Sequence, residues 1–124
     1  MASEADGPLP QVNAEQFFGV DIRVGRIISV APFPKARKPA WKAEVDLGPL
    51  GRKWSSAQIT NYSEAELVGT LVVCVCNFPP RNIAGFSSEV LILGAPDKDG
   101  NVILLSPRKS ADGDDLVEVG ARIF

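Results

Sequence analysis

A strict alternation of apolar and polar side chains in one stretch limits the possible folds of this chain more than any other feature. The stretch has four apolar residues, each followed by a polar residue or glycine: Trp41, Lys42, Ala43, Glu44, Val45, Asp46, Leu47 and Gly48. Successive side chains of a strand point to opposite faces of a sheet, so these residues are predicted to form a strand with one buried face. Val20, Ile22 and Val24 repeat the pattern. The chain is therefore predicted to be built mainly from half-buried strands.

Local signals place the remaining elements. Asn13 and Gln16 are spaced to cap a short helix, and Ser63 with Glu66 has the spacing of a capping box for a second. Gly25, where the alternation breaks, is expected to mark a bulge or bend. Further strands are predicted at residues 52–59, 71–76, 89–93 and 102–105, and residues 78–86 are expected to be a long loop.

This order of elements predicts an all-β protein. Five strands with a helix between the third and fourth are typical of an OB-fold barrel. The expected architecture is a five-stranded OB-fold barrel with a short N-terminal helix, a short helix between strands 3 and 4, and a C-terminal hairpin extension. We expect residues 1–12 to be a mobile tail, residues 13–95 to form the OB-fold domain, and residues 96–124 to form a hairpin and dimerisation extension.

The composition excludes several chemistries. There is no histidine, so Ser-His-Asp triads, Cys-His pairs and histidine-bound zinc are ruled out. The two cysteines, Cys74 and Cys76, are too few for a disulfide framework and are predicted to be small buried hydrophobes. The N-terminus has no apolar signal region, and no apolar run is long enough to span a bilayer. We expect a cytoplasmic, non-catalytic protein without a metal or cofactor.

The charge is unevenly distributed along the chain. The net charge is −2, but residues 21–94 carry nine of the 13 lysines and arginines and only six of the 15 acidic residues. Six of these nine bases lie between Lys35 and Lys53. A basic surface of this kind can attract phosphate groups, although solvated surface charge is the ordinary alternative.

Three longer stretches carry a family resemblance: VDIRVGRI at residues 20–27, SSAQIT at residues 55–60 and NFPPRNIAGFSSEVL at residues 77–91. Together they resemble the tRNA-binding-domain family of OB-folds, which includes free-standing dimeric tRNA-binding proteins and domains appended to some tRNA synthetases. They are most similar to its CsaA-like branch, described as export-related chaperones. Residues 33–40 lack the acidic, histidine-containing run that is common in the RNA-binding branch, which also favours the CsaA-like branch.

The resemblance implies binding without catalysis. The polar family pattern, together with the strands on which OB-folds bind ligands, predicts six nucleic-acid-binding residues: Lys42, Arg52, Lys53, Asn77, Arg81 and Ser88. Asn77 and Ser88 have a purely structural alternative, which is to fix the loop backbone. Phe78 and Phe86 are predicted to bind peptide or to stack on bases. A two-fold dimer interface is predicted from apolar residues near the two ends of the chain: Phe17, Phe18, Val102, Ile103, Leu104 and Leu105.

Two functions follow as hypotheses. The first is a homodimeric, CsaA-like chaperone that binds unfolded or export-destined polypeptides and keeps a tRNA-binding-type surface. The alternative is a protein that binds structured RNA, with tRNA as the natural ligand, and acts as an affinity module for tRNA or a synthetase. Phe78 and Phe86 serve both hypotheses, so the sequence alone does not separate them.

Overall fold

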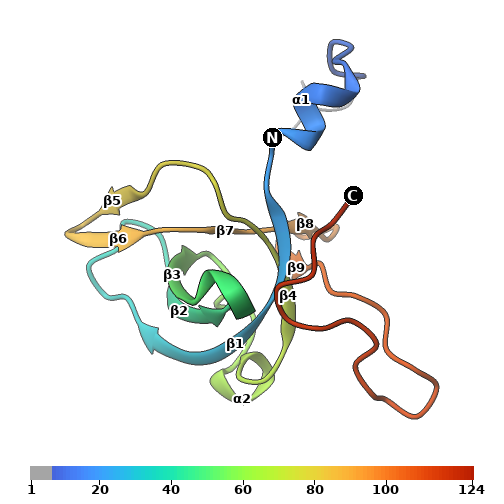
Figure 1. Ribbon diagram of the computed structural model, residues 1–124. Helices are drawn as coiled ribbons and strands as arrows, with labels where there is room; N and C mark the ends of the chain where they lie inside the picture. Colours follow the sequence, from blue (N-terminus) through green and yellow to red (C-terminus); the bar gives the residue numbers. More distant parts are fainter. Residues whose placement is uncertain (1–6) are drawn as a thin grey trace.

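The long strand β1 (Ile22–Pro32) is the centre of the fold, which a computed structural model describes for residues 7–124 (Figure 1). Its first half pairs with β4 (Leu71–Val75) and its second half with β2 (Trp41–Asp46). β3 (Arg52–Ala57) continues the sheet beyond β2, and β7 (Leu91–Ile92) continues it beyond β4. All neighbours are antiparallel, in the order β3-β2-β1-β4-β7.

The two edge strands then approach each other and nearly close the barrel. The backbone N–H groups of Glu89 and Val90, just before β7, donate to the carbonyl oxygen of Trp54 in β3, at 2.7 and 3.4 Å. The predicted five-stranded OB-fold barrel is therefore confirmed. Residues 1–6 of the predicted mobile tail lie outside the described residues, and residues 7–12 are exposed.

β1 changes partner at Arg26, and Gly25 permits the close crossing there. A Cβ atom on Gly25 would lie 2.4 Å from Cγ1 of Val45 and 2.8 Å from Cδ2 of Leu47. Of the two alternatives expected at Gly25, the bulge is wrong, because the register shift of β1 against β2 occurs between Ile27 and Ser29. The bend stays a prediction. Gly25 is needed for close packing of backbone against side chains.

Both predicted helices are present with their capping boxes. In α1 (Ala14–Phe18) the Asn13 side chain accepts from the Gln16 N–H, and the Gln16 side chain accepts from the Asn13 N–H. Ser63 and Glu66 make the equivalent pair of bonds at α2 (Glu64–Leu67). α2 lies between β3 and β4 and buries Leu67, whereas every residue of α1 is exposed. Figure 1 shows α1 standing off the barrel.

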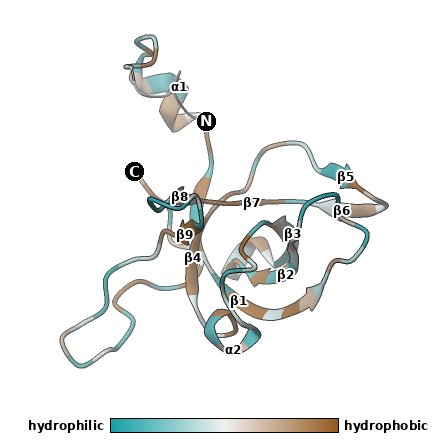
Figure 2. Ribbon diagram, turned by 180° about the vertical axis from the view of Figure 1, so that it is seen from behind, coloured by the Kyte–Doolittle hydropathy of each residue, from teal (hydrophilic) through white to brown (hydrophobic). Residues whose placement is uncertain are grey.

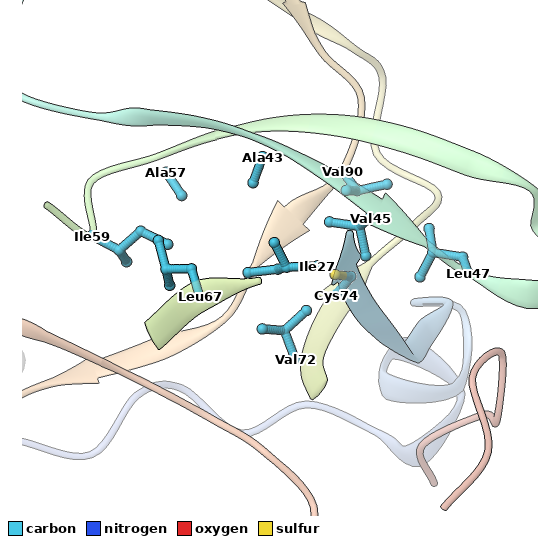
Figure 3. Close-up of a cluster of buried hydrophobic side chains, with 10 residues drawn as sticks. All are labelled: Ile27, Ala43, Val45, Leu47, Ala57, Ile59, Leu67, Val72, Cys74 and Val90. Atoms are coloured by element: carbon cyan, nitrogen blue, oxygen red, sulfur yellow. The ribbon is translucent and has the colours of Figure 1, made fainter. Parts of the chain in front are cut away.

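The core lies inside the barrel. Each strand of the main sheet, or a residue next to that strand, contributes at least one buried side chain to it. Figure 3 shows ten side chains gathered there: Ile27, Ala43, Val45, Leu47, Ala57, Ile59, Leu67, Val72, Cys74 and Val90. β4 is apolar along its whole length, as its brown ribbon in Figure 2 shows, and four of its five residues are buried. Both faces of β4, which lies between β1 and β7, are therefore covered.

Two small hairpins extend the barrel. β5 (Arg81–Ile83) and β6 (Phe86–Ser88) form one within the segment expected to be a loop. Its turn was not predicted because Ala84 and Gly85 both have positive φ angles, of 50° and 84°, and alanine rarely adopts this conformation. β8 (Gly94–Pro96) and β9 (Val102–Leu104) form the second, the predicted C-terminal hairpin.

The connections complete the structure. The 3-10 turn η2 (Gly48–Leu50) links β2 to β3. Residues 120–123 return along β1, where the N–H of Ile123 donates to the carbonyl of Ile22 and the N–H of Val24 donates to the carbonyl of Ala121. Among residues 7–124, no helix has the length and apolar character needed to cross a membrane.

Candidate ligand-binding face

The β5–β6 hairpin covers the outer face of β2 and β3. The Phe86 ring packs edge-on against Trp54, with ring centroids 6.1 Å apart, and against Phe33, at 5.3 Å. The Ser56 N–H donates to Oγ of Ser88 at 3.0 Å. Aromatic contacts and a hydrogen bond therefore hold the hairpin in one position over the strands on which OB-folds commonly bind ligands.

The register of β2 and β3 sorts the predicted basic residues onto two faces. Lys42 is opposite Ser56, and Arg52 is opposite Asp46, so both bases lie on the outer face. Lys53 is opposite the buried Val45, so it lies on the other face of the sheet. The nucleic-acid-binding residues predicted on these strands thus do not form one continuous basic strip.

Lys42 is held above two aromatic rings. Its Nζ atom lies 4.9 Å from the Phe33 ring centroid and 5.1 Å from that of Phe86, within the range of a cation–π interaction. These residues line a cleft of about 360 Å³ together with Pro34, Lys35 and the Ala84–Gly85 turn. None of the residues lining this cleft is acidic, so both ammonium groups are available to an anionic ligand.

A second hollow, which we call the basic groove, runs from the β1–β2 loop to β7. It has a volume of about 480 Å³, and Arg37, Lys38 and Arg81 provide its charged side chains. The remaining lining consists of small, polar and apolar residues: Ala36, Ala40, Ser56, Ala57, Gln58, Ile59, Ile83, Leu91, Ile92 and Val102. The groove thus combines three positive charges with an apolar floor and includes no acidic residue.

A third hollow, which we call the apolar pocket, lies at the base of the hairpin, where the segments before β5 and after β6 meet β3. Its volume is about 240 Å³. Five apolar residues and four polar ones line it: Phe78, Pro79, Ile83, Val90, Leu91, Ser56, Arg81, Ser88 and Glu89. The side chains of Phe78 and Leu91 are half-exposed there, at 50% and 47%. The single acid, Glu89, already accepts a hydrogen bond from the Trp54 N–H.

The structure brings some predicted residues together and separates others. Arg81 lies at the junction of the groove and the pocket, whereas Phe86 lines the cleft and Phe78 lines the pocket. Asn77 is bonded elsewhere: its Oδ1 accepts from the Asp21 N–H at 2.8 Å and its Nδ2 donates to the Gly19 carbonyl at 2.9 Å. Asn77 and Ser88 thus have the backbone-fixing contacts of the structural alternative, and their contact with nucleic acid remains a prediction.

Trp54 also lies on this face, although it is not among the site residues predicted from the sequence. The buried residues of β3 are Ser55 and Ala57. They alternate with Trp54 and Ser56, so the spacing already separates the two faces of the strand. Trp54 is partly buried because Phe86 of the hairpin packs against it from outside the barrel.

The cysteines offer no reactive thiolate to this face. Cys74 and Cys76 are both free, and Cys74 is fully buried. Burial raises the pKa of the Cys74 thiol to about 12, and burial likewise raises the pKa of Cys76. Within the described residues, no three histidine, cysteine, aspartate or glutamate side chains group to hold a metal ion.

Comparisons with known proteins show the family of the chain. Residues 22–115 match the family model described as "Putative tRNA binding domain". Among curated proteins, the chain is 39% identical over 93 residues to a methionine–tRNA ligase of Porphyromonas gingivalis, and 36% identical over 101 residues to one of Methanocaldococcus jannaschii. These matches cover 75% and 82% of this chain but only 14% and 15% of the ligases.

Two solved structures match over nearly the whole chain. A CsaA chaperone from Picrophilus torridus is 45% identical with a TM-score of 0.83, and one from Bacillus anthracis is 41% identical with a TM-score of 0.82. The matches cover 92% and 93% of this chain and all of each CsaA chain. From the matched family model and these full-length likenesses we conclude that the chain belongs to the tRNA-binding-domain family and resembles the CsaA chaperones.

Proposed function

We propose that the chain is a non-catalytic binding protein that captures unfolded or export-destined polypeptides at the apolar pocket. The observation that carries this proposal is the pair of half-exposed apolar side chains, Phe78 and Leu91, that line the pocket beside Arg81. Apolar side chains that line a concave site together with a few polar groups are typical of ligand-binding sites. The likeness to CsaA chaperones supports the same function.

The physical basis is burial of apolar surface. Moving one leucine- or phenylalanine-sized side chain from water into an apolar site contributes roughly 1.5–3 kcal/mol. A single pocket of this size therefore supports weak, reversible binding of many sequences, which suits capture of unfolded chains. Because apolar burial does not depend on charge, this binding is expected to persist as salt is raised.

The test is fluorescence anisotropy with a short uncharged peptide of Leu, Phe, Ser and Gly, labelled with tetramethylrhodamine. Saturable binding by the natural protein is expected, with little change between about 50 and 200 mM salt. Phe78→Ala is expected to weaken binding by roughly tenfold, from the lost side-chain burial. Leu116→Ala is the matched control, because Leu116 is an exposed apolar residue that lines none of the three hollows. No binding by the natural protein contradicts the proposal.

The basic groove favours a second function, binding of structured RNA such as tRNA. Arg37, Lys38 and Arg81 line it, none of its other lining residues is acidic, and the matched family model is described as a tRNA binding domain. Each phosphate contact releases counterions, so affinity for tRNA should fall steeply between about 50 and 200 mM salt.

Anisotropy of labelled tRNA tests this second function. Arg81→Gln is expected to lower the affinity for tRNA. It should also reduce the slope of the logarithm of the binding constant against the logarithm of salt concentration by about one, because one phosphate contact is lost. Arg108→Gln, an exposed arginine outside the three hollows, should change neither. Equal effects of the two variants would show that binding is only a response to overall charge.

A further inference from the structure

The basic groove and the apolar pocket are adjoining hollows that share part of their lining. Four residues line both: Ser56, Arg81, Ile83 and Leu91. They come from β3, β5 and β7, so the overlap does not depend on one flexible side chain. Resting on the proposed function, we infer that a polypeptide and a polynucleotide bind this surface in a mutually exclusive manner.

Arg81 is the charged residue that both ligands would contact, because it lines both hollows. Its guanidinium forms none of the ion pairs found among residues 7–124, and it stands beside apolar Ile83 and Leu91. A nucleic-acid phosphate bound to Arg81 would hold its own water shell, and the polynucleotide backbone that carries it, at the mouth of the apolar pocket. An apolar side chain in the pocket needs that mouth free of water and charge. The two ligands therefore require the same position in incompatible states of hydration.

The surface has little freedom to widen and admit both. Ser56 is tied to Ser88 across the gap, and the Glu89 side chain is tied to the backbone of Trp54. Phe86 adds its contacts to Trp54 and Phe33 at the other end of the hairpin. Moving the hairpin away from β3 to separate the two hollows would break all of these contacts at once. We therefore expect peptide and tRNA to compete for the surface and not to form a ternary complex with the protein.

Competition has a quantitative form. If binding is exclusive, the apparent Kd of the peptide rises by the factor one plus the ratio of free tRNA to its own Kd. Free tRNA at ten times its Kd should thus weaken peptide binding about 11-fold. By reciprocity, saturating peptide must weaken tRNA binding in the same way.

The experiment uses the full-length protein with the labelled uncharged peptide already bound, titrated with unlabelled tRNA at about 50 mM salt. The expected result is a fall of the anisotropy to that of free peptide, with a competition constant equal to the directly measured Kd for tRNA. In the double variant Arg37→Gln/Lys38→Gln, the displacement curve should shift to higher tRNA concentration in proportion to its weaker direct binding. Arg108→Gln should leave the curve unchanged.

The possible outcomes separate the inference from the proposed function. If peptide and tRNA each bind alone and the anisotropy rises further on adding tRNA, a ternary complex forms and the inference is wrong while peptide capture stands. If peptide binds but tRNA does not, the inference is again overturned and the proposed function survives. If the peptide does not bind the natural protein, the proposed function itself fails, and the inference fails with it.

Discussion

Asn77 uses its whole side-chain amide to join two elements that are distant in sequence. It accepts from the Asp21 N–H and donates to the Gly19 carbonyl, at the junction between α1 and β1. Asn77→Ala removes both bonds, and each is worth about 1 kcal/mol. Amide hydrogen exchange in residues 14–21 should become faster, with little effect on the barrel strands. Thr60→Ala, at an exposed residue remote from this junction in the sequence, is the control.

The same variant tests the predicted role of Asn77 in binding nucleic acid. Faster exchange at α1 with unchanged affinity for tRNA would establish a positioning residue. Lower affinity for tRNA with unchanged exchange at α1 would instead show that Asn77 contacts the ligand directly.

Asp21 makes stability depend on pH. Its Oδ1 accepts from Nε of Arg23 at 2.7 Å, and Arg122 lies 4.0 Å away. The hydrogen bond from Arg23 and both positive charges hold the pKa of Asp21 below its ordinary value, against the opposing effect of burial. The folded state therefore gains stability from this carboxylate above about pH 4, and loses it as pH falls toward the lowered pKa.

Asp21→Asn should thus lower the free energy of unfolding near neutral pH by about 0.5 kcal/mol, since solvent screens a partly exposed pair. Urea unfolding from about pH 3 to pH 7 should show the difference from the natural protein shrinking on acidification. Asp99→Asn, at an exposed acid without an ion pair in the described residues, should show no such trend. A difference that stays constant with pH would exclude this mechanism.

At the scale of elements, the crossing of β1 over β2 can be tested at Gly25. A methyl group there would meet Cγ1 of Val45 at 2.4 Å and Cδ2 of Leu47 at 2.8 Å. Overpacking of this kind costs roughly 1–3 kcal/mol, so Gly25→Ala should lower the urea midpoint clearly. Gly19→Ala is the matched control, because its nearest contact would be 3.4 Å and its backbone is already helical. Equal stability of the two variants would refute the crowding argument.

The positions of helices and strands were easier to predict from the sequence than the face of the sheet on which each side chain lies. Alternation in β1 and β2 and the capping boxes of both helices identified most elements directly, since these signals are local. The β5–β6 hairpin was missed because its Ala84–Gly85 turn lacks a typical turn sequence. The face of Trp54 and the separation of Lys53 from Lys42 depend on strand register and on what covers each face, and both are tertiary properties.

At the scale of the whole molecule, the exposed apolar ends lie away from the β5–β6 hairpin, although Val102 of β9 also lines the basic groove. Figures 1 and 2 show the β5–β6 hairpin on one side of the barrel, with α1 and the β8–β9 hairpin on the other. Phe17 and Phe18 of α1 are exposed to 43% and 58%, and Ile103 and Leu105 are each exposed to 44%. Val102 and Leu104, also predicted at the interface, pack partly against the core of their own barrel.

We propose that a second copy of the chain covers these exposed apolar residues and forms a two-fold dimer. None of these residues lines the apolar pocket, so the pocket of each copy would stay open and a long unfolded chain or a folded RNA can contact both copies. The second contact forms at high effective concentration, which raises affinity for long ligands but not for short ones.

Phe18→Ser tests this assembly, because a polar side chain at the most exposed aromatic of α1 removes apolar surface from the interface without entering the core. Sedimentation equilibrium should show dimers of the natural protein and mainly monomers of the variant. The variant should bind the short labelled peptide as the natural protein does, yet bind tRNA or a long unfolded chain roughly a hundredfold more weakly. Leu116→Ser, an equally drastic change at another exposed apolar residue, should remain dimeric. A natural protein that sediments as a monomer would rule out the dimer, and a dimeric Phe18→Ser variant would rule out α1 as its contact.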